Sequence, residues 1–255
     1  MDIRGKVALI TGGASGIGAA IARHSAAAGA APVVADIDTE AATAVAHEAG
    51  GRSVHLDVTD PASWERALDE VGPPDIAFLN AGISLGEADI AAIDDDRYHA
   101  AIAVNVNGVF FGARAMRRRM HAGGTVMATA SLAGLTPMPT DPVYAATKHA
   151  IIGLVRSIAP SFGEQGIRVL ALCPGMADTP LVRGTIRESL EAAGFPLIEA
   201  DDIARAAMTA LASGENGEAW AIQAGREPLA YTFRGVPGPR VPGREGVVPP
   251  GIPGG

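Results

Sequence analysis

Three residues in the middle of the chain could carry out proton chemistry. Tyr144 and Lys148 are four positions apart, so on a helix they share one face. A lysine ammonium beside a tyrosine favours the phenolate and lowers the tyrosine pKa from its usual value of about 10. The phenol could then exchange a proton near neutral pH. Ser131 follows a strand-like run, residues 125–129, so we expect it at the carboxyl end of a strand, where parallel sheets bind ligands. Alone, a Tyr–Lys pair at this spacing is more often a solvated helix face.

A second set of residues, near the start of the chain, could bind a phosphate. Residues 6–10 form a short apolar run, and the sequence TGGASGIG follows at positions 11–18. Residues 19–28 are rich in alanine and favour a helix. A glycine turn between a strand and a helix brings backbone N–H groups and a helix N-terminus to a phosphate. Gly12 would serve the turn, and Gly16 and Gly18 would permit close approach. A plain turn is the alternative.

Asp36 indicates which nucleotide would bind. It ends the next expected strand, residues 32–36, close to the offset of about 20 residues at which an acid binds the ribose. Its carboxylate would accept hydrogen bonds from both adenosine ribose hydroxyls and repel a 2′-phosphate. No Arg or Lys occurs in residues 12–18 or 36–40 to neutralise such a phosphate. The pattern predicts NAD rather than NADP. The alternative is that Asp36 only caps the helix that begins near residue 39.

The remaining elements alternate between strands and helices. Asp57 stands at the end of a predicted strand, Asp60 and Pro61 open a helix, and Asn80-Ala81-Gly82 forms a turn after another strand. We expect the other strands at residues 52–56, 75–79, 167–172 and 218–223, and the other helices at residues 40–49, 62–71, 94–120, 144–162 and 201–212. This rhythm predicts a single-domain, Rossmann-type α/β fold, a doubly wound parallel sheet of about seven strands flanked by helices.

Two features interrupt this pattern. Asn105 falls inside the expected helix 94–120 beside a glycine, which is unfavourable locally and predicts a bend or a functional reason. Residues 226–255 are dominated by Gly and Pro beyond position 235. Their composition indicates disorder, and our hypothesis is an extended arm over this or a neighbouring subunit. We therefore assign residues 1–225 to the domain and 226–255 to the arm.

Composition excludes several classes of function. The chain has 255 residues and a net charge of −8, which argues against nucleic-acid partners and anionic membrane surfaces. We identify no secretory signal and no apolar run of about 20 residues that could span a bilayer, so we expect a cytoplasmic protein. One cysteine, Cys173, excludes an internal disulfide. The six histidines show no metal-ligand spacing, and we expect no metal.

Together, these motifs resemble the short-chain dehydrogenase/reductase family, in its compact NAD(P)-dependent branch, from about residue 6 to residue 223. Several residues match family motifs in the family's order: Thr11, Gly12, Gly16 and Gly18 of the cofactor turn, Asp57 near the adenine, the turn of Asn80, Ala81 and Gly82, the helix asparagine Asn105, the catalytic Ser131, Tyr144 and Lys148, and Pro174, Gly175 and Thr179 by the nicotinamide.

The resemblance implies a mechanism. Tyr144 exchanges the alcohol proton while hydride passes to the cofactor NAD. Lys148 holds the nicotinamide ribose and, with the positively charged nicotinamide, lowers the tyrosine pKa. Ser131 orients the substrate oxygen, and Asn105 holds a water through its main chain. The implied cofactor-binding residues are Gly12, Ser15, Gly16, Ile17, Gly18, Asp36, Ile37, Asp57, Val58, Asn80, Ala81, Gly82, Tyr144, Lys148, Pro174, Gly175 and Thr179, and the substrate-binding residues are Ser131 and Tyr144.

The substrate and the assembly are less defined. We expect the substrate walls in residues 83–86, 132–139 and 176–196, the last with the mixed composition typical of a mobile lid. Their apolar residues, Leu85, Leu132, Leu135, Met138, Met176 and Leu181, together with Leu197, favour a lipophilic secondary alcohol or ketone. Arg183 and Arg187 could bind a carboxylate or be exposed on the lid. A homotetramer is implied by the resemblance, with a homodimer as the alternative.

Two other functions are weighed against this one. An NADP-linked 3-oxoacyl-thioester reductase would need a basic residue near Asp36, and none is present. A non-catalytic NAD-sensing regulator would be expected to lack the Tyr144–Lys148 pair, which is intact. We therefore predict an NAD-dependent dehydrogenase acting on a small molecule with a CH–OH group.

Overall fold

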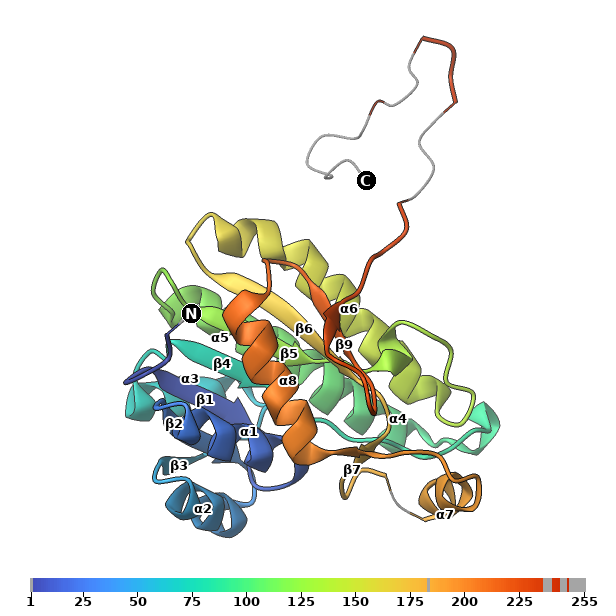
Figure 1. Ribbon diagram of the computed structural model, residues 1–255, viewed down its shortest axis with the longest axis horizontal. Helices are drawn as coiled ribbons and strands as arrows, with labels where there is room; N and C mark the ends of the chain where they lie inside the picture. Colours follow the sequence, from blue (N-terminus) through green and yellow to red (C-terminus); the bar gives the residue numbers. More distant parts are fainter. Residues whose placement is uncertain (1, 183, 236–239, 244–246, 248–255) are drawn as a thin grey trace.

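A computed structural model describes residues 2–182, 184–235, 240–243 and 247. Within them the main sheet has eight strands in the order β10-β9-β6-β5-β4-β1-β2-β3. The strands from β9 to β3 run parallel, and β10 is antiparallel to β9. The predicted doubly wound sheet is confirmed (Figure 1). The strands are β1 Val7–Thr11, β2 Ala31–Asp36, β3 Arg52–His55, β4 Ile76–Leu79, β5 Thr125–Thr129, β6 Arg168–Pro174, β9 Ala219–Ile222 and β10 Leu229–Ala230.

The helices fill the connections between strands. They are α1 Gly16–Ala27, α2 Thr39–Glu48, α3 Pro61–Val71, α4 Asp95–Ile102, α5 Gly108–Arg119, α6 Pro142–Gly163, α7 Thr185–Ala192 and α8 Ala200–Ser213. Short 3-10 turns lie at Ile90–Ala92 (η1) and Leu132–Gly134 (η3), and a π-helical turn lies at Ala103–Asn107 (η2). Beyond β6, the two-residue strands β7 (Ala177–Asp178) and β8 (Ile198–Glu199) pair with each other. They flank α7, which Figure 1 shows beside β7 at the margin of the molecule.

Helices cover both faces of the sheet, so its strands are apolar on both sides. In β1, Leu9 belongs to the core that α3, α5 and α6 cover. Its neighbours Ala8 and Ile10 face the other core, covered by α1, α2 and α8. Trp64 of α3 is the largest fully buried side chain of the first core, and its indole N–H donates to Val58 O. The two packed layers fix the strand ends rigidly relative to one another.

The strand order reverses beside β1, because β2 lies on one side of it and β4 on the other. The loops after β1 and β4 therefore leave toward different faces of the sheet. This leaves a crevice at the carboxyl ends, which is where such sheets bind ligands. All of the predicted functional turns follow strands that end at this edge.

The structure differs from the sequence predictions in three places. The expected helix over residues 94–120 is divided by the π-helical turn η2, which contains Asn105. The lid region, residues 176–196, has a defined helix, α7. Past residue 225, β10 pairs with β9 and Phe233 packs on the core beneath Arg156, whose guanidinium carbon lies 3.9 Å from the ring centroid. The proposed arm, residues 226–255, lies partly outside the described residues.

Candidate active site

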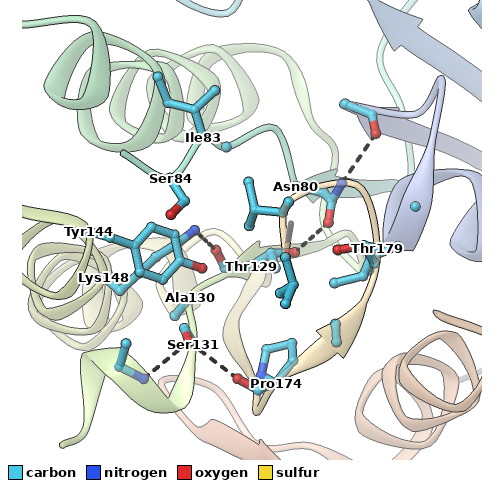
Figure 2. Close-up of a pocket in the computed structure, with 18 of the residues that line it drawn as sticks. Asn80, Ile83, Ser84, Thr129, Ala130, Ser131, Tyr144, Lys148, Pro174 and Thr179 are labelled. Carbon is cyan, nitrogen blue, oxygen red and sulfur yellow. Dashed lines mark hydrogen bonds between the residues drawn. The ribbon is translucent and has the colours of Figure 1, made fainter. Parts of the chain in front are cut away.

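A cavity of about 600 Å³ opens at the carboxyl edge of the sheet. Its walls come from the loops after β1, β2, β3, β4, β5, β6 and β9 and from the start of α6. Figure 2 shows the residues at its centre, with Tyr144, Lys148 and Ser131 grouped at one end and Asn80 and Thr179 at the other. The crevice expected from the topology is therefore a real cavity.

Helix α6 places Tyr144 and Lys148 in this cavity. The helix begins at Pro142 because the Asp141 carboxylate caps it, accepting from Tyr144 N at 2.9 Å. One turn later, Lys148 Nζ donates to Thr129 O at 2.8 Å and lies 5.3 Å from the Tyr144 ring centroid. Lys148 is only 3% exposed. The predicted pair thus shares one face, directed at the end of β5.

The protonation behaviour of this pair corrects the sequence prediction. Burial raises the pKa of Tyr144 to about 12, and the Asp141 carboxylate acts in the same direction, while a hydrogen bond with Ser131 opposes them. Burial also lowers the pKa of Lys148 to about 8. The predicted lowering of the tyrosine pKa by lysine is therefore wrong for the chain alone. Burial is the largest cause of both shifts, because leaving water disfavours the charged form of each group.

These two pKa shifts predict how stability changes with pH. Between about pH 8 and 10.5, unfolded chains keep a proton on Lys148 that folded chains have lost, so the unfolding free energy should rise with pH. Above about pH 10 the folded chain keeps the Tyr144 proton that the unfolded chain loses, so this gain should reverse. From pH 7 to pH 10, we expect the unfolding free energy of the wild type to rise by on the order of 1–3 kcal/mol more than that of Lys148→Met. Guanidinium unfolding of both proteins measures this difference, and parallel curves would contradict it.

Ser131 stands between β5 and the turn after β6. Its hydroxyl donates to Pro174 O at 3.3 Å and accepts from Ala133 N at 3.1 Å, which caps the 3-10 turn η3. Since the cap fixes the oxygen and the donated bond is long, the serine hydrogen can turn toward a ligand oxygen in the cavity. The predicted position at a strand end is confirmed.

Asn105 is fully buried and does not line the cavity. Its side-chain nitrogen donates to Ile83 O at 2.8 Å and to Thr147 Oγ1 at 3.1 Å, and its side-chain oxygen accepts from Ile83 N at 2.8 Å. The side chain therefore joins α6 to the loop after β4, and it sits within the π-helical turn. Such turns often mark functional sites. The role of its main chain toward a water stays a prediction.

The glycine turn after β1 has the geometry of a phosphate site. Gly12 adopts a φ of +63°, and a Cβ there would lie 2.8 Å from Ala81 Cα. A Cβ on Gly18 would overlap Gly12 O, so this buried glycine shapes the turn without lining the cavity. Ser15 precedes α1 without capping it through its side chain. The first N–H groups of α1 therefore lack a side-chain acceptor where Gly16 and Ile17 line the cavity, which fits an anionic pyrophosphate.

Two polar residues, Asn80 and Asp36, bond to the backbone of this glycine turn. Asn80 donates through its side chain to Thr11 O at 3.2 Å and Gly12 O at 3.3 Å, so it holds the turn in place. Asp36 lines the cavity at the end of β2, and its two oxygens accept from Ala14 N and Asp38 N, each at 3.1 Å. A dinucleotide fits this donor and acceptor set, with N–H groups for phosphate and a carboxylate for ribose hydroxyls.

Most predicted site residues meet in this one cavity. Apart from Gly18 and Asn105, all of the residues predicted to bind cofactor or act in catalysis line it: Gly12, Ser15, Gly16, Ile17, Asp36, Ile37, Asp57, Val58, Asn80, Ala81, Gly82, Ser131, Tyr144, Lys148, Pro174, Gly175 and Thr179. Asp57 also accepts from Thr59 N at 2.9 Å, which shapes its own loop.

The predicted substrate walls are correct in part. All three predicted segments reach the cavity, but Leu85, Leu135 and Leu197 do not line it. Arg187 is held by Asp178 at 2.5 Å and Glu191 at 2.8 Å, which anchors α7 to β7. Arg183 lies outside the described residues. Leu132, Met138, Met176, Leu181, Val182 and Phe195 make the outer part of the cavity apolar.

Some lining residues were missed by the sequence analysis. Thr129 supplies the carbonyl that holds Lys148, and Gln223 lies just past β9, at the same edge of the sheet. The strand-end rule could have identified both. Phe195 reaches the cavity from the loop after α7; it lies within the predicted wall, residues 176–196, but was not among the apolar residues singled out there. Val104 comes from the π-helical turn, which periodicity does not reveal.

Metal ligands and membrane-spanning helices are two further features that the described residues could contain. No group of three or more His, Cys, Asp or Glu side chains among them could hold a metal ion. None of the described helices has the length and apolar character needed to cross a membrane.

Comparison with known proteins agrees with this geometry. Residues 6–189 match the short chain dehydrogenase family. The chain is 34% identical over 247 residues to 3beta-hydroxysteroid dehydrogenase 2 of Eggerthella lenta, an alignment that covers 88% of this chain and 95% of that protein.

Solved structures give the same result. A short chain dehydrogenase from Burkholderia cenocepacia in complex with NADP is similar with a TM-score of 0.80 at 29% identity, covering 88% of this chain and 99% of that one. The 3-ketoacyl-(acyl-carrier-protein) reductase from Brucella melitensis complexed with NADH has a TM-score of 0.78 at 30% identity, with the same coverage. The two neighbours were thus crystallised with different nicotinamide cofactors.

Proposed function

The chain belongs to the short-chain dehydrogenase/reductase family of oxidoreductases, and on that premise we propose that it is an NAD-dependent enzyme interconverting a secondary alcohol and a ketone. The observation that carries this proposal is the convergence of Tyr144, Lys148 and Ser131 at one end of a cavity whose other end suits a dinucleotide. A bound nicotinamide would supply the acceptor or donor of the hydride.

The chain's own residues would manage the proton and the substrate oxygen. Tyr144 Oη takes the hydroxyl proton as the alcohol becomes a ketone, and returns it in the reverse direction. Ser131 donates to the substrate oxygen and stabilises the negative charge that develops there. The Lys148 ammonium supplies positive charge near the phenol. Because the pKa of Tyr144 is raised to about 12, mainly by burial, nearby positive charge is required for it to act as a base near neutral pH.

Asp36 supports NAD as the cofactor. A 2′-phosphate placed beside its carboxylate would meet a like charge, which is unfavourable. Among the described residues that line the cavity, Lys148 is the only lysine or arginine, and it belongs to the catalytic end. The described chain therefore offers no cation that would neutralise a 2′-phosphate beside Asp36 within the cavity.

Removing the charge of Asp36 should therefore change cofactor preference. In Asp36→Ala we expect the kcat/KM ratio of NAD+ to NADP+ to fall about tenfold or more, because repulsion of the phosphate and binding of the ribose are lost together. Steady-state kinetics with both cofactors measure the ratio. Asp36→Asn keeps an oxygen that can accept a hydrogen bond but removes the charge, so it should also improve the use of NADP+. Equal use of both cofactors by the wild type would show that this interpretation is wrong.

The apolar outer cavity supports a lipophilic substrate. Met138, Leu181 and Phe195 come from three separate loops and line its outer part. Burial of apolar carbon contributes about 25 cal/mol per Å², so larger cyclic alcohols should bind more tightly than small ones. The hydroxysteroid dehydrogenase of Eggerthella lenta is consistent with this class of substrate.

One assay tests the proposed function directly. The enzyme is given NAD+ and a secondary alcohol, and the formation of NADH is followed by absorbance. The alcohols increase in size from butan-2-ol through cyclohexanol to terpenoid and steroid alcohols. We expect kcat/KM to rise with apolar size. The absence of turnover across the panel, with NAD+ or NADP+, would contradict the proposal.

We also propose that the chain assembles as a homotetramer, with a homodimer as the alternative. Tyr98 of α4 and Phe110 of α5 are 44% and 45% exposed, so both present aromatic rings to solvent. Arg114 stacks over Phe110, with its guanidinium carbon 5.6 Å from the ring centroid. A second copy that covers this face would bury all three side chains. Light scattering coupled to gel filtration gives the mass of the assembly.

A further inference from the structure

Asp141 does more than cap helix α6. Its side chain is fully buried and bridges α6 to the loop that follows β4. One carboxylate oxygen accepts from Tyr144 N at 2.9 Å. The other accepts from Ser84 Oγ at 2.7 Å, Leu85 N at 2.9 Å and Gly86 N at 2.8 Å. A buried charge is tolerated only when such partners compensate it.

These contacts fix the direction of the hydrogen bond between Ser84 and Asp141. A carboxylate offers about four acceptor sites and no donor. Three of its partners are backbone N–H groups, which can only donate, so the carboxylate accepts from each. The fourth partner, Ser84, must then donate its single hydroxyl hydrogen to Asp141. The Ser84 oxygen keeps lone pairs but has no hydrogen left for another partner.

Ser84 also lines the catalytic cavity, together with Ile83 and Tyr144 (Figure 2). A ligand that approaches its oxygen therefore meets a hydrogen-bond acceptor. Its neighbour Ile83 presents apolar carbon to the same cavity, so a polar group of the ligand gains most by meeting Ser84.

We propose that Ser84, oriented by Asp141, forms a second polar subsite that accepts a hydrogen bond from a donor on the substrate, such as a second hydroxyl group. The inference rests on the proposed function, since the reacting alcohol occupies the position beside Tyr144 and Ser131. It narrows the substrate class to lipophilic alcohols or ketones that carry a further hydrogen-bond donor.

The loop that carries Ser84 is held rigidly, which favours specific recognition. Asn105 binds both backbone groups of Ile83. Arg97 donates to Leu85 O at 3.0 Å, so both backbone groups of Leu85 have partners. Because the acceptor is already positioned, a substrate donor loses little free energy in ordering it.

The test compares substrates that differ only in the donor. Cyclohexane-1,2-, 1,3- and 1,4-diols are compared with their mono-O-methyl ethers, which keep an oxygen acceptor and lose the second O–H. For at least one regioisomer we expect wild-type kcat/KM to favour the diol about tenfold or more, equivalent to about 1.4 kcal/mol. In Ser84→Ala this preference should fall to within about twofold of unity. Ser84→Thr keeps a hydroxyl and should retain the preference.

A matched control uses another hydroxyl of the cavity wall. Thr136 lines the cavity and donates to Leu132 O at 3.0 Å, but it contacts no buried carboxylate. Thr136→Val should leave the preference for the diol unchanged. Ligand-observed NMR titration of each diol and ether into wild type and Ser84→Ala provides the same comparison without turnover.

The outcomes separate the two proposals. If wild type turns over the alcohols but its preference is absent, or is unchanged in Ser84→Ala, the subsite is wrong and the proposed function stands. If Thr136→Val removes the preference instead, the donor binds elsewhere and the subsite is also wrong. If no alcohol or ketone reacts with either cofactor, the proposed function fails and the subsite fails with it.

Discussion

Replacing Tyr144 with phenylalanine is expected to lower kcat/KM for a secondary alcohol by about a thousandfold. Proton transfer by a positioned side chain accelerates a reaction about 10²–10⁴-fold. Among the described residues that line the cavity, no other phenol lies next to Ser131 and Lys148 to replace Tyr144. Initial rates of NADH formation on the best alcohol of the panel measure the change.

The matched measurement for this variant is the binding of NADH, followed by fluorescence. Tyr144→Phe removes one oxygen and keeps the ring that packs over Lys148, so the dissociation constant should change by less than about threefold. If activity falls only because cofactor binding falls, the phenol positions the cofactor and is not the acid/base. Activity within about tenfold of wild type would remove Tyr144 from the mechanism altogether.

Replacing Asp141 with alanine is expected to lower the unfolding free energy by about 3–5 kcal/mol. The change removes a fully buried acceptor and leaves the backbone N–H groups of Leu85, Gly86 and Tyr144 without it in a partly buried region. Each buried donor that loses its partner costs about 1–3 kcal/mol, and relaxation of the loop recovers part of this. Guanidinium unfolding followed by circular dichroism measures the loss.

Asp60 provides the matched control for this prediction. It also precedes a proline and caps a helix, α3, accepting from Ala62 N at 2.8 Å and Ser63 N at 3.1 Å. It binds no distant loop, however, and its side chain is 42% exposed. We expect Asp60→Ala to cost about 1 kcal/mol, as is typical of helix caps. If the two variants lose equal stability, the bridge from Asp141 to the loop contributes nothing beyond capping.

Much of the fold follows from local patterns in the sequence. The apolar runs predicted the main parallel strands, because strands covered on both faces need little else to identify them. The carboxyl-edge rule then brought Asp36, Asn80, Ser131 and Pro174 to one cavity. These residues are far apart in the sequence, but each ends a strand or follows one within two residues. Local chemistry was therefore enough to place them.

The role of Asp141 could not be predicted in the same way. The Asp–Pro pair at positions 141 and 142 carries the same helix signal as Asp60–Pro61. Its contacts with Ser84, Leu85 and Gly86, however, span more than 50 residues of sequence and depend on how α6 packs on the loop. The raised pKa of Tyr144 has a similar origin, since it reflects burial in the folded chain and not spacing along a helix.

The π-helical turn is another feature that the sequence did not predict. Periodicity predicted one helix across residues 94–120, and only the local misfit of Asn105 indicated an irregularity. The extra residue of the turn accompanies the bonds of Asn105 to Ile83 and Thr147, which lie on other elements. A tertiary contact thus coincides with a change in helix type that propensity does not reveal.

The pairing of β10 with β9 has a consequence for how separate molecules meet. An uncovered edge strand offers unpaired N–H and C=O groups, which can join sheets of different copies into aggregates. Leu229 and Ala230 cover part of that edge of β9. At the opposite edge, β3 is only four residues long and carries Arg52 and His55. Both edges of the sheet therefore disfavour edge-to-edge pairing with another copy. At one of them, this protection comes from the segment that follows residue 225.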